Sequence, residues 1–136
     1  MIPLIIDFRP LGDSRGHLVA IEAESAVPFP VRRVYYIYGT RRGVERGFHA
    51  HKALRQVAVA VAGSCEMLLD DGSSECSVFL DSQTQGVLIE PGVWHYMRKF
   101  SPDCVLLVLA DQHYDESDYI RDYGDFKQWV ATSSNS

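Results

Sequence analysis

GVERGFHAHKALRQVAVAVAG, residues 43–63, carries two histidines one residue apart between glycines, and this stretch decides how the fold is read. Side chains alternate between the two faces of a strand, so we expect His49 and His51 on one face and Phe48 and Ala50 on the other. Two imidazoles then converge on one small volume. An arrangement of this kind can hold a metal, transfer protons or form part of a polar core.

The residues after the histidines alternate in size. An amide and small side chains alternate with valines along the run from Gln56 to Ala62. One face of this strand is therefore β-branched and suited to tight packing, whereas the other is nearly empty. We expect the alanine face to leave room for a ligand beside the histidines.

Short extended segments separated by turn signals make up most of the chain. Each is rich in Val, Ile, Leu or Tyr, as strands are. The segments are Ile2 to Phe8, His17 to Glu22, Val31 to Tyr38, Gly47 to His51, Gln56 to Leu69, Ser77 to Leu80, Gln85 to Ile89, Trp94 to Arg98 and Cys104 to Ala110. Strands of this number and spacing predict an all-β sandwich or small barrel, with a hairpin turn at Asp71-Gly72.

The C-terminal stretch departs from this pattern. Apolar side chains recur at helical spacing from Glu116 to Ala131, which predicts a helical segment packed as a lid on the sandwich. Gly124 is expected to divide it into two helical turns. We expect Thr132 to Ser136 to be a frayed polar end.

Composition limits the class of protein. A chain of 136 residues suits one domain, here residues 1–136, and a net charge of −5 without a basic block argues against nucleic acid as a partner. The apolar opening MIPLIIDF is too short for a membrane span and lacks the basic region of a signal peptide. Three widely spaced cysteines fit reduced thiols, so a cytoplasmic location is expected.

Two spaced motifs resemble those of the cupin family of β-barrels. They are Gly43-x5-His49-x-His51-x4-Gln56-x6-Gly63 and Gly86-x4-Pro91-Gly92-x2-His95. The resemblance implies a cupin-type jelly roll. In metal-binding cupins the position of Gln56 is usually a glutamate, and a neutral amide is a much poorer ligand than a carboxylate. His49, His51 and His95 alone retain the makings of an open three-imidazole zinc site, but we expect no metal.

Longer strings resemble one group of enzymes, the sugar 3,4-ketoisomerases that act on dTDP-4-keto-6-deoxyglucose. These strings are RVYYIYGT (residues 33–40), RGFHAHKAL (46–54), PGVWHYM (91–97) and DCVLLVLADQHYDESDYIRDY (103–123). The resemblance implies an enzyme without metal or other cofactor that moves the ketone from C4 to C3 of a dTDP-linked 4-keto-6-deoxyhexose. It also implies a role in making 3-amino-3,6-dideoxy sugars for lipopolysaccharide or S-layer glycans. A homodimer with exchanged N-terminal strands is implied as well.

This reaction requires a base, an acid and a group that holds the charge of an enediolate. Histidine suits proton transfer because its ordinary pKa is near neutrality. We assign His51 as the base at C3 and His49 as its partner, although the residues alone leave their order open. A tyrosine hydroxyl is a candidate oxyanion donor, and we choose Tyr36 over Tyr35, which alternation places on the opposite face.

The remaining site residues are expected to hold the substrate. Guanidinium groups match phosphate oxygens, and the candidates for binding the diphosphate are Arg15, Arg41, Arg46 and Arg98. Gln56 and His95 are expected to contact substrate in the cavity. The stereochemistry of the product, galacto or gluco, stays open.

Two other functions compete with this one. A metal-dependent cupin, such as a dioxygenase or another sugar isomerase, gains from the three histidines and loses from Gln56. A non-catalytic cupin that binds a nucleotide sugar would not need His49 or His51.

Overall fold

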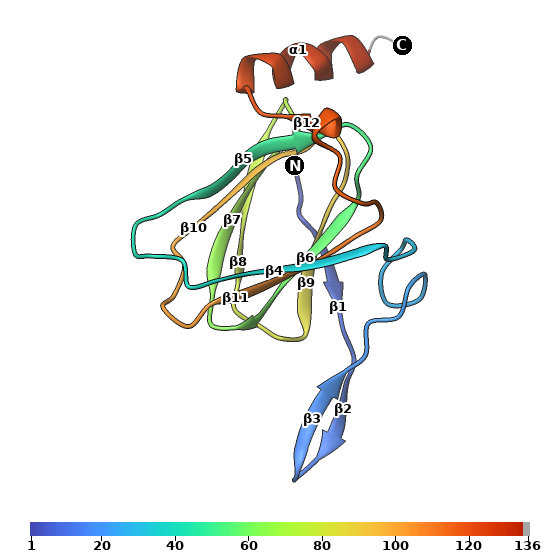
Figure 1. Ribbon diagram of the computed structural model, residues 1–136, viewed down its shortest axis with the longest axis vertical. Coiled ribbons are helices and arrows are strands. Elements are labelled where there is room, and N and C mark those ends of the chain that lie inside the picture. Colours follow the sequence, from blue (N-terminus) through green and yellow to red (C-terminus); the bar gives the residue numbers. More distant parts are fainter. Residues whose placement is uncertain (135–136) are drawn as a thin grey trace.

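Two five-stranded antiparallel sheets face each other and enclose the core of the molecule (Figure 1). The computed structural model describes residues 1–134. The first sheet consists, in spatial order, of β1 (Leu4–Asp7), β9 (Gln85–Ile89), β6 (Gln56–Ala62), β11 (Val105–Ala110) and β4 (Arg33–Tyr38). The second consists of β12 (Tyr119–Ile120), β5 (Arg46–His51), β10 (Trp94–Arg98), β7 (Cys65–Asp70) and β8 (Glu75–Leu80). The predicted all-β, cupin-type sandwich with a C-terminal helix is confirmed.

The alternation along β6 is built into the core as the sequence predicts, but its consequence differs. Val57 and Val59 point outward into a cluster with Phe29, while Ala58 and Ala60 point between the sheets. The alanines pack against larger side chains of the interior, and neither lines the cavity that holds the histidines. Small side chains here admit bulky neighbours such as Met67 rather than a ligand.

The predicted strand from Gln56 to Leu69 is two strands in different sheets. β6 ends at Ala62 and β7 begins at Cys65. Gly63 between them has a φ of 62°, and a Cβ there would lie 2.3 Å from the Ser101 hydroxyl. Only glycine fits this sharp crossing between the sheets. The hairpin predicted at Asp71-Gly72 is confirmed, because β7 pairs with β8 across it.

A further hairpin projects from the sandwich. β2 (Pro10–Asp13) pairs with β3 (Gly16–Val19), and Figure 1 shows the pair extending from the body of the molecule below β1. β2 lies between the predicted segments Ile2 to Phe8 and His17 to Glu22 and is not among the predicted strands. Its four residues contain a proline and a glycine, which weaken the sequence signal for a strand.

The C-terminal segment contains less helix than the sequence analysis predicts. Residues Glu116–Asp118 form a 3₁₀ turn, β12 follows, and α1 spans Tyr123–Ser134. Gly124 lies inside the first turn of α1 and does not break it. The helix starts where it does because the Asp122 carboxylate accepts a hydrogen bond from the Asp125 amide at 2.8 Å. Of the predicted frayed end, residues 132–134 belong to α1 and 135–136 lie outside the described residues.

α1 packs on the outer side of the second sheet. Phe126 is fully buried in a cluster with Ala50, Trp94 and Ile120, and Trp129 and Val130 pack against it. Figure 1 shows the helix above β5 and β12. The helix therefore packs on the sandwich as predicted, but no residue of α1 lines the cavity that holds the histidines, and the helix supports β5 from its outer face. Within residues 1–134, no helix has the length and apolar character needed to cross a membrane.

Replacing Phe126 with alanine should destabilise the protein by about 3 kcal/mol or more, because truncating a buried phenylalanine leaves a cavity. The measurement is urea unfolding followed by circular dichroism. Gln128→Ala on the exposed side of the same helix serves as the control and should change the free energy of unfolding by less than about 0.5 kcal/mol. Equal stabilities of the two variants would contradict this account of α1.

Candidate active site

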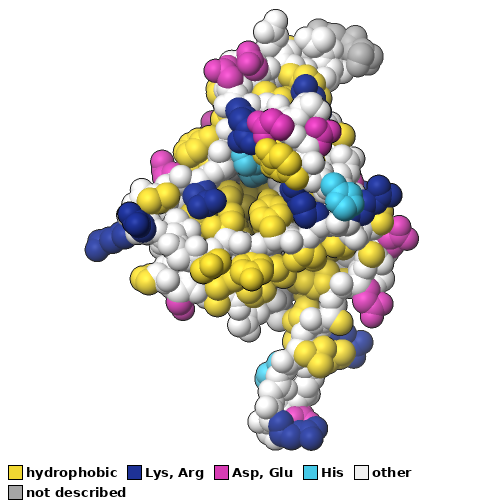
Figure 2. All heavy atoms as spheres, viewed as in Figure 1, with side chains coloured by type: hydrophobic (Ala, Val, Ile, Leu, Met, Phe, Trp, Pro, Cys, Tyr) yellow, Lys and Arg dark blue, Asp and Glu magenta, His cyan; other side chains and the backbone are white. Residues whose placement is uncertain are grey.

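A cavity of about 380 Å³ opens between the two sheets. Its walls come from β4 (Arg33, Tyr35, Tyr36 and Ile37), β5 (Arg46, Gly47 and His49), β10 (His95 and Met97), the segment leading to β12 (Tyr114) and β12 itself (Tyr119). Figure 2 shows a hollow in this face, with a histidine at its upper edge and basic side chains on both sides. The site therefore combines imidazoles, phenols and guanidinium groups.

β5 directs both of its histidines inward, as the alternation predicts. The ring centroids of His49 and His51 lie 5.0 Å apart, whereas Ala50 is buried beneath α1. Phe48, with a φ of 61°, forms a bulge opposite β10, because His95 pairs with His49 and Tyr96 pairs with Gly47. A bulge bends its strand and re-aims the side chain beside it, here His49.

Gly47 makes this bulge possible. Its φ is 106°, and a Cβ on it would lie 2.9 Å from the Cα of Tyr96. On the outer face, the ring of Phe48 stacks on that of Tyr96 with centroids 4.5 Å apart. Gly47 is therefore needed because only glycine allows this close approach of β5 to β10 next to the bulge.

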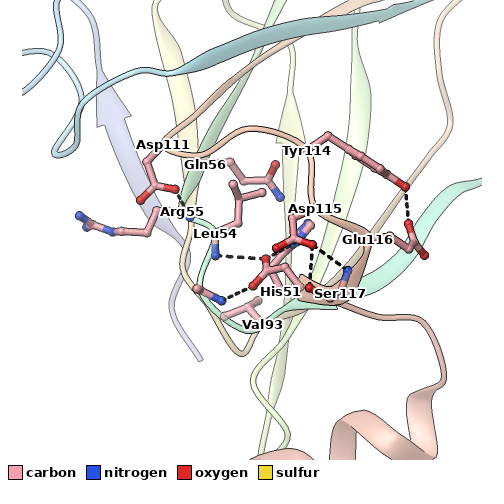
Figure 3. Close-up of polar contacts among 12 residues, drawn as sticks. His51, Leu54, Arg55, Gln56, Val93, Asp111, Tyr114, Asp115, Glu116 and Ser117 are labelled. Carbon is pink, nitrogen blue, oxygen red and sulfur yellow. Dashed lines mark hydrogen bonds and ion pairs between the residues drawn. The ribbon is translucent and has the colours of Figure 1, made fainter.

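His51 is oriented by a carboxylate from the far end of the chain. Its Nδ1 lies 3.1 Å from Oδ2 of Asp118, which accepts the Nδ1 proton. The Asp118 carboxylate also accepts the backbone N–H of Ala53 at 2.8 Å and of Leu54 at 3.3 Å. Figure 3 shows His51 beside Leu54 and the turn in which Asp115 accepts hydrogen bonds from Ser117. Because Nδ1 donates, Nε2 of His51 keeps a free lone pair for a substrate proton.

A chain of hydrogen bonds fixes His95. The Tyr35 hydroxyl donates to Oε1 of Gln56 at 3.1 Å, and Nε2 of Gln56 lies 3.3 Å from Nε2 of His95. Nδ1 of His95 lies 3.0 Å from the carbonyl oxygen of Val93. This carbonyl can only accept, so Nδ1 carries the proton and Nε2 accepts from the Gln56 amide. Both nitrogens of His95 are engaged, which suits a positioning role better than proton transfer.

Burial keeps the imidazoles uncharged. It is the main cause that lowers the pKa of His51 to about 3, and nearby His49 and Arg33 lower it further. Burial and the neighbouring His49 likewise lower the pKa of His95 to about 3, and burial lowers the pKa of His49. The contact between His51 and Asp118 is therefore a hydrogen bond from a neutral ring, which becomes an ion pair only when His51 takes up a proton.

Several predicted site residues lie together. His49, His95 and Arg46 line the cavity, His51 adjoins it through His49, and Gln56 reaches it through His95. Their roles toward substrate stay predictions.

Tyr36 is placed differently from the expectation. Its side chain is 61% exposed on the outward face of β4, although it contributes to the rim of the cavity, and Tyr35 is the tyrosine directed inward. The choice between the two faces of β4 was wrong, because both carry aromatic side chains and alternation alone does not say which is the inner one. Burial raises the pKa of Tyr35 to about 12, so its hydroxyl stays protonated.

Three predicted arginines lie outside this cavity. Arg98 forms an ion pair with Glu66 at 2.6 Å, and Arg15 pairs with Asp13 at the tip of the projecting hairpin. Arg41 borders a separate hollow with Arg42 and Phe100. None of the three lines the cavity of its own chain, and their role toward the diphosphate stays a prediction.

The sequence analysis missed Asp118, Tyr119 and Arg33. Asp118 and Tyr119 reach the site because β12 pairs with β5 and brings Tyr119 opposite His51, with ring centroids 4.4 Å apart. A two-residue strand leaves almost no trace in the sequence pattern. Arg33 shares the inner face of β4 with Tyr35, so the correct choice of face would have found it.

The three histidines could also hold a cation. One ligand atom from each of His49, His51 and His95 lies within 4.8 Å of the others. The Gln56 amide donates to the Nε2 atom that His95 would offer, and it brings no negative charge. The donor set thus matches a metal in number and spacing but lacks an anionic ligand.

Stability should decrease as the pH falls below about 6.5. Between that value and pH 3, His51 and His95 bind protons in the unfolded chain but not in the folded one, so acid favours unfolding. Each group contributes about 1.4 kcal/mol per pH unit in this window. Urea unfolding should show a loss of about 2–3 kcal/mol between pH 7.5 and pH 5.5. His95→Gln should remove about half of this dependence, and an unchanged slope in that variant would contradict the assignment.

Comparisons with known proteins identify the family of this chain. A family model described as FdtA, WxcM-like, C-terminal matches residues 2–131. A TDP-4-oxo-6-deoxy-α-D-glucose-3,4-oxoisomerase from Aneurinibacillus thermoaerophilus is 51% identical over 127 residues, which are 93% of this chain and 91% of the relative.

Solved structures of ketoisomerases share the fold. A 3,4-ketoisomerase from Helicobacter canadensis has a TM-score of 0.92 and 43% identity over 96% of this chain and 98% of its own. The 3,4-ketoisomerase QdtA from Thermoanaerobacterium thermosaccharolyticum, a histidine-to-asparagine mutant in complex with TDP-4-keto-6-deoxyglucose, has a TM-score of 0.93 and 38% identity over 96% and 94%. This chain therefore belongs to the WxcM-like FdtA family of sugar 3,4-ketoisomerases.

Proposed function

We propose that this enzyme moves the ketone from C4 to C3 of dTDP-4-keto-6-deoxyglucose by proton transfer through an enediol. The observation that carries the proposal is a neutral His51 whose Nδ1–H is held by Asp118 and whose neighbour His49 lines the cavity. The relatives supply the substrate class, since one is named for this sugar nucleotide and another is a complex with it.

His51 acts first, as the base. The C4 ketone acidifies the proton on C3, and Nε2 of His51 removes it while the electron pair forms the enediolate. Asp118 stabilises the imidazolium that results, because its carboxylate already accepts the Nδ1 proton. Such positioned proton transfer typically contributes about 10²- to 10⁴-fold to a rate.

His49 completes the transfer. Its ring lies 5.0 Å from that of His51, and two imidazoles at this distance disfavour being charged together. When His51 holds the C3 proton, His49 therefore remains neutral and can exchange protons with O3 and O4. The proton delivered to C4 comes from His51 or from solvent through His49. The face of C4 that receives this proton determines whether the product is galacto or gluco.

The diphosphate belongs at the other end of the cavity. Arg46 begins β5, five residues before His51, and lines the same cavity. Guanidinium donors match phosphate oxygens in geometry and charge. We assign Arg46 to the diphosphate, and the product to a 3-amino-3,6-dideoxy sugar pathway in the cytoplasm, formed without metal or other cofactor.

We further propose a homodimer built on the outward face of β4. Val34, Tyr36 and Tyr38 are 54%, 61% and 70% exposed there, and Figure 2 shows hydrophobic side chains in a band below the hollow. Apolar patches of this kind mark interfaces. In this chain β1 pairs with its own β9, while the β2–β3 hairpin projects. Exchange of the N-terminal strands would carry Arg15, at the tip of that hairpin, to the partner's cavity.

Incubation with dTDP-4-keto-6-deoxyglucose in heavy water should give the 3-keto isomer with deuterium at C4, read by NMR. His51→Asn should lower product formation and deuterium uptake by at least about 10²-fold while TDP still binds, because the base is lost. Gln128→Asn, on the exposed side of α1 and outside the cavity, is the control and should stay active.

The same experiment separates the alternatives. Activity that survives a chelator and removal of bound metal supports proton transfer by histidine. Activity that disappears with the metal would favour the metal-dependent cupin, an alternative that the spacing of the three histidines supports. Binding of TDP without any conversion would favour the non-catalytic cupin.

Tyr38→Glu should convert the protein from a dimer to a monomer of 15.3 kDa, because two copies of the new carboxylate would be buried at the interface. Light scattering coupled to size-exclusion chromatography measures the mass. Phe79→Glu on β8, where the side chain is 55% exposed on the other sheet, is the matched control and should remain dimeric. A monomeric parent chain would disprove the dimer.

A further inference from the structure

Buried polar atoms without partners point to a role for Arg33. Among the side chains of the described residues, three such atoms have no hydrogen-bond partner, namely Nε of Arg33, Oγ1 of Thr40 and Nδ1 of His49. Arg33 and His49 line the same cavity. An unsatisfied buried donor costs about 1–3 kcal/mol, and more when it is charged. Nε of Arg33 is itself too buried to touch a ligand, so the terminal Nη groups of this cavity-lining side chain are the donors available to one.

Arg33 is held in place by rings rather than by a carboxylate. Its guanidinium carbon lies 5.0 Å from the ring centroid of Tyr35 and 5.9 Å from that of Tyr114. None of the ion pairs found within residues 1–134 includes it. A positioned guanidinium without a counter-ion beside a cavity is complementary to an anion.

The position of Arg33 identifies which part of the substrate it meets. It borders the cavity and also a small adjoining space with His51 and Asp118. Arg46 also lines the cavity but lies five residues before His51 on β5, about 15 Å along an extended strand. Arg33 therefore lies at the end where the proton is transferred, and Arg46 lies toward the opposite end.

The chemistry requires a cation at this end. When His51 takes the C3 proton, the C–H electron pair forms a C3=C4 bond and the carbonyl pair moves to O4. In the second half, O3 loses its proton and forms the new carbonyl, C4 takes a proton and O4 is protonated. Nothing is oxidised or reduced overall, and the charge passes from O4 to O3. These two oxygens are neighbours in one plane, which suits the parallel N–H donors of a guanidinium.

We infer that Arg33 is a catalytic residue that binds the enediolate, donating N–H groups of its two terminal nitrogens to O4 and O3. This inference rests on the proposed function. Arg33 replaces Tyr36 as the oxyanion donor, because Tyr36 is 61% exposed on the outward face of β4. The hydroxyl of Tyr35, on the inner face, already donates to Gln56. One cation serves both half-reactions, since it contacts both oxygens.

Three variants test this assignment. Arg33→Met keeps an apolar stem against Tyr35 and Tyr114 but removes the charge, and Arg33→Lys keeps the charge without the fork. Arg32→Met, at an exposed arginine that does not line the cavity, is the matched control. The measurements are kcat with dTDP-4-keto-6-deoxyglucose by NMR, the Kd for TDP by calorimetry, and the melting temperature.

Arg33→Met should lower kcat by about 10²- to 10³-fold, the loss found when one oxyanion donor is removed, with the Kd for TDP changed less than twofold. Arg33→Lys should recover part of kcat. Arg32→Met should leave both kcat and the Kd for TDP close to those of the parent.

Two results would overturn the inference. One is an unchanged kcat in Arg33→Met. The other is a tenfold weaker Kd for TDP with kcat retained at saturation, which would make Arg33 a diphosphate ligand. If Arg33→Met does not fold, the same criteria apply to Arg33→Lys, whose kcat should lie at least tenfold below that of the parent. A parent chain that does not convert the sugar would overturn the proposed function itself, and this inference with it.

Discussion

Three imidazole rings share one buried space, and burial favours the uncharged form of each. Hydrogen bonds also fix two of the rings. His51 donates to Asp118, and His95 is engaged at both nitrogens by Val93 and Gln56. The cost of burying cations keeps the rings neutral, and neutral rings are the form that can accept a proton. The rest of the site follows from how the backbone maintains this arrangement.

β5 maintains it by pairing on both edges. β10 on one side places His95 beside His49, and β12 on the other places Asp118 next to His51. α1 packs behind the strand and buries Ala50, so the strand is fixed from its outer face as well. The bulge at Phe48 is accommodated by Gly47, where a side chain would collide with β10. Rotations and shifts of the rings are thereby limited by backbone contacts.

The sequence predicts those parts of the site that depend on alternation within one strand. His49 and His51 share a face, and the valines and alanines of β6 take opposite faces, because period two is a property of any strand. It does not predict which face of β4 is the inner one, since Arg33 and Tyr35 compete with Val34 and Tyr36 for that position. The sheet's overall packing decides this choice. The sequence does not predict the contact of Asp118 for a different reason. His51 lies 67 residues before it in the chain, and only the pairing of the two-residue strand β12 with β5 brings the two side chains together.

The orientation of the Gln56 side chain has a consequence for how this scaffold changes its chemistry. Its oxygen accepts from Tyr35 and its nitrogen donates to His95, so both ends of the amide are used. A carboxylate of the same shape would present a lone pair to the lone pair of His95, and only a shared proton or a cation could relieve the repulsion. A barrel that uses acid–base catalysis and one that uses a metal therefore differ at this position by a single group, an amide NH₂ in one and a carboxylate O⁻ in the other.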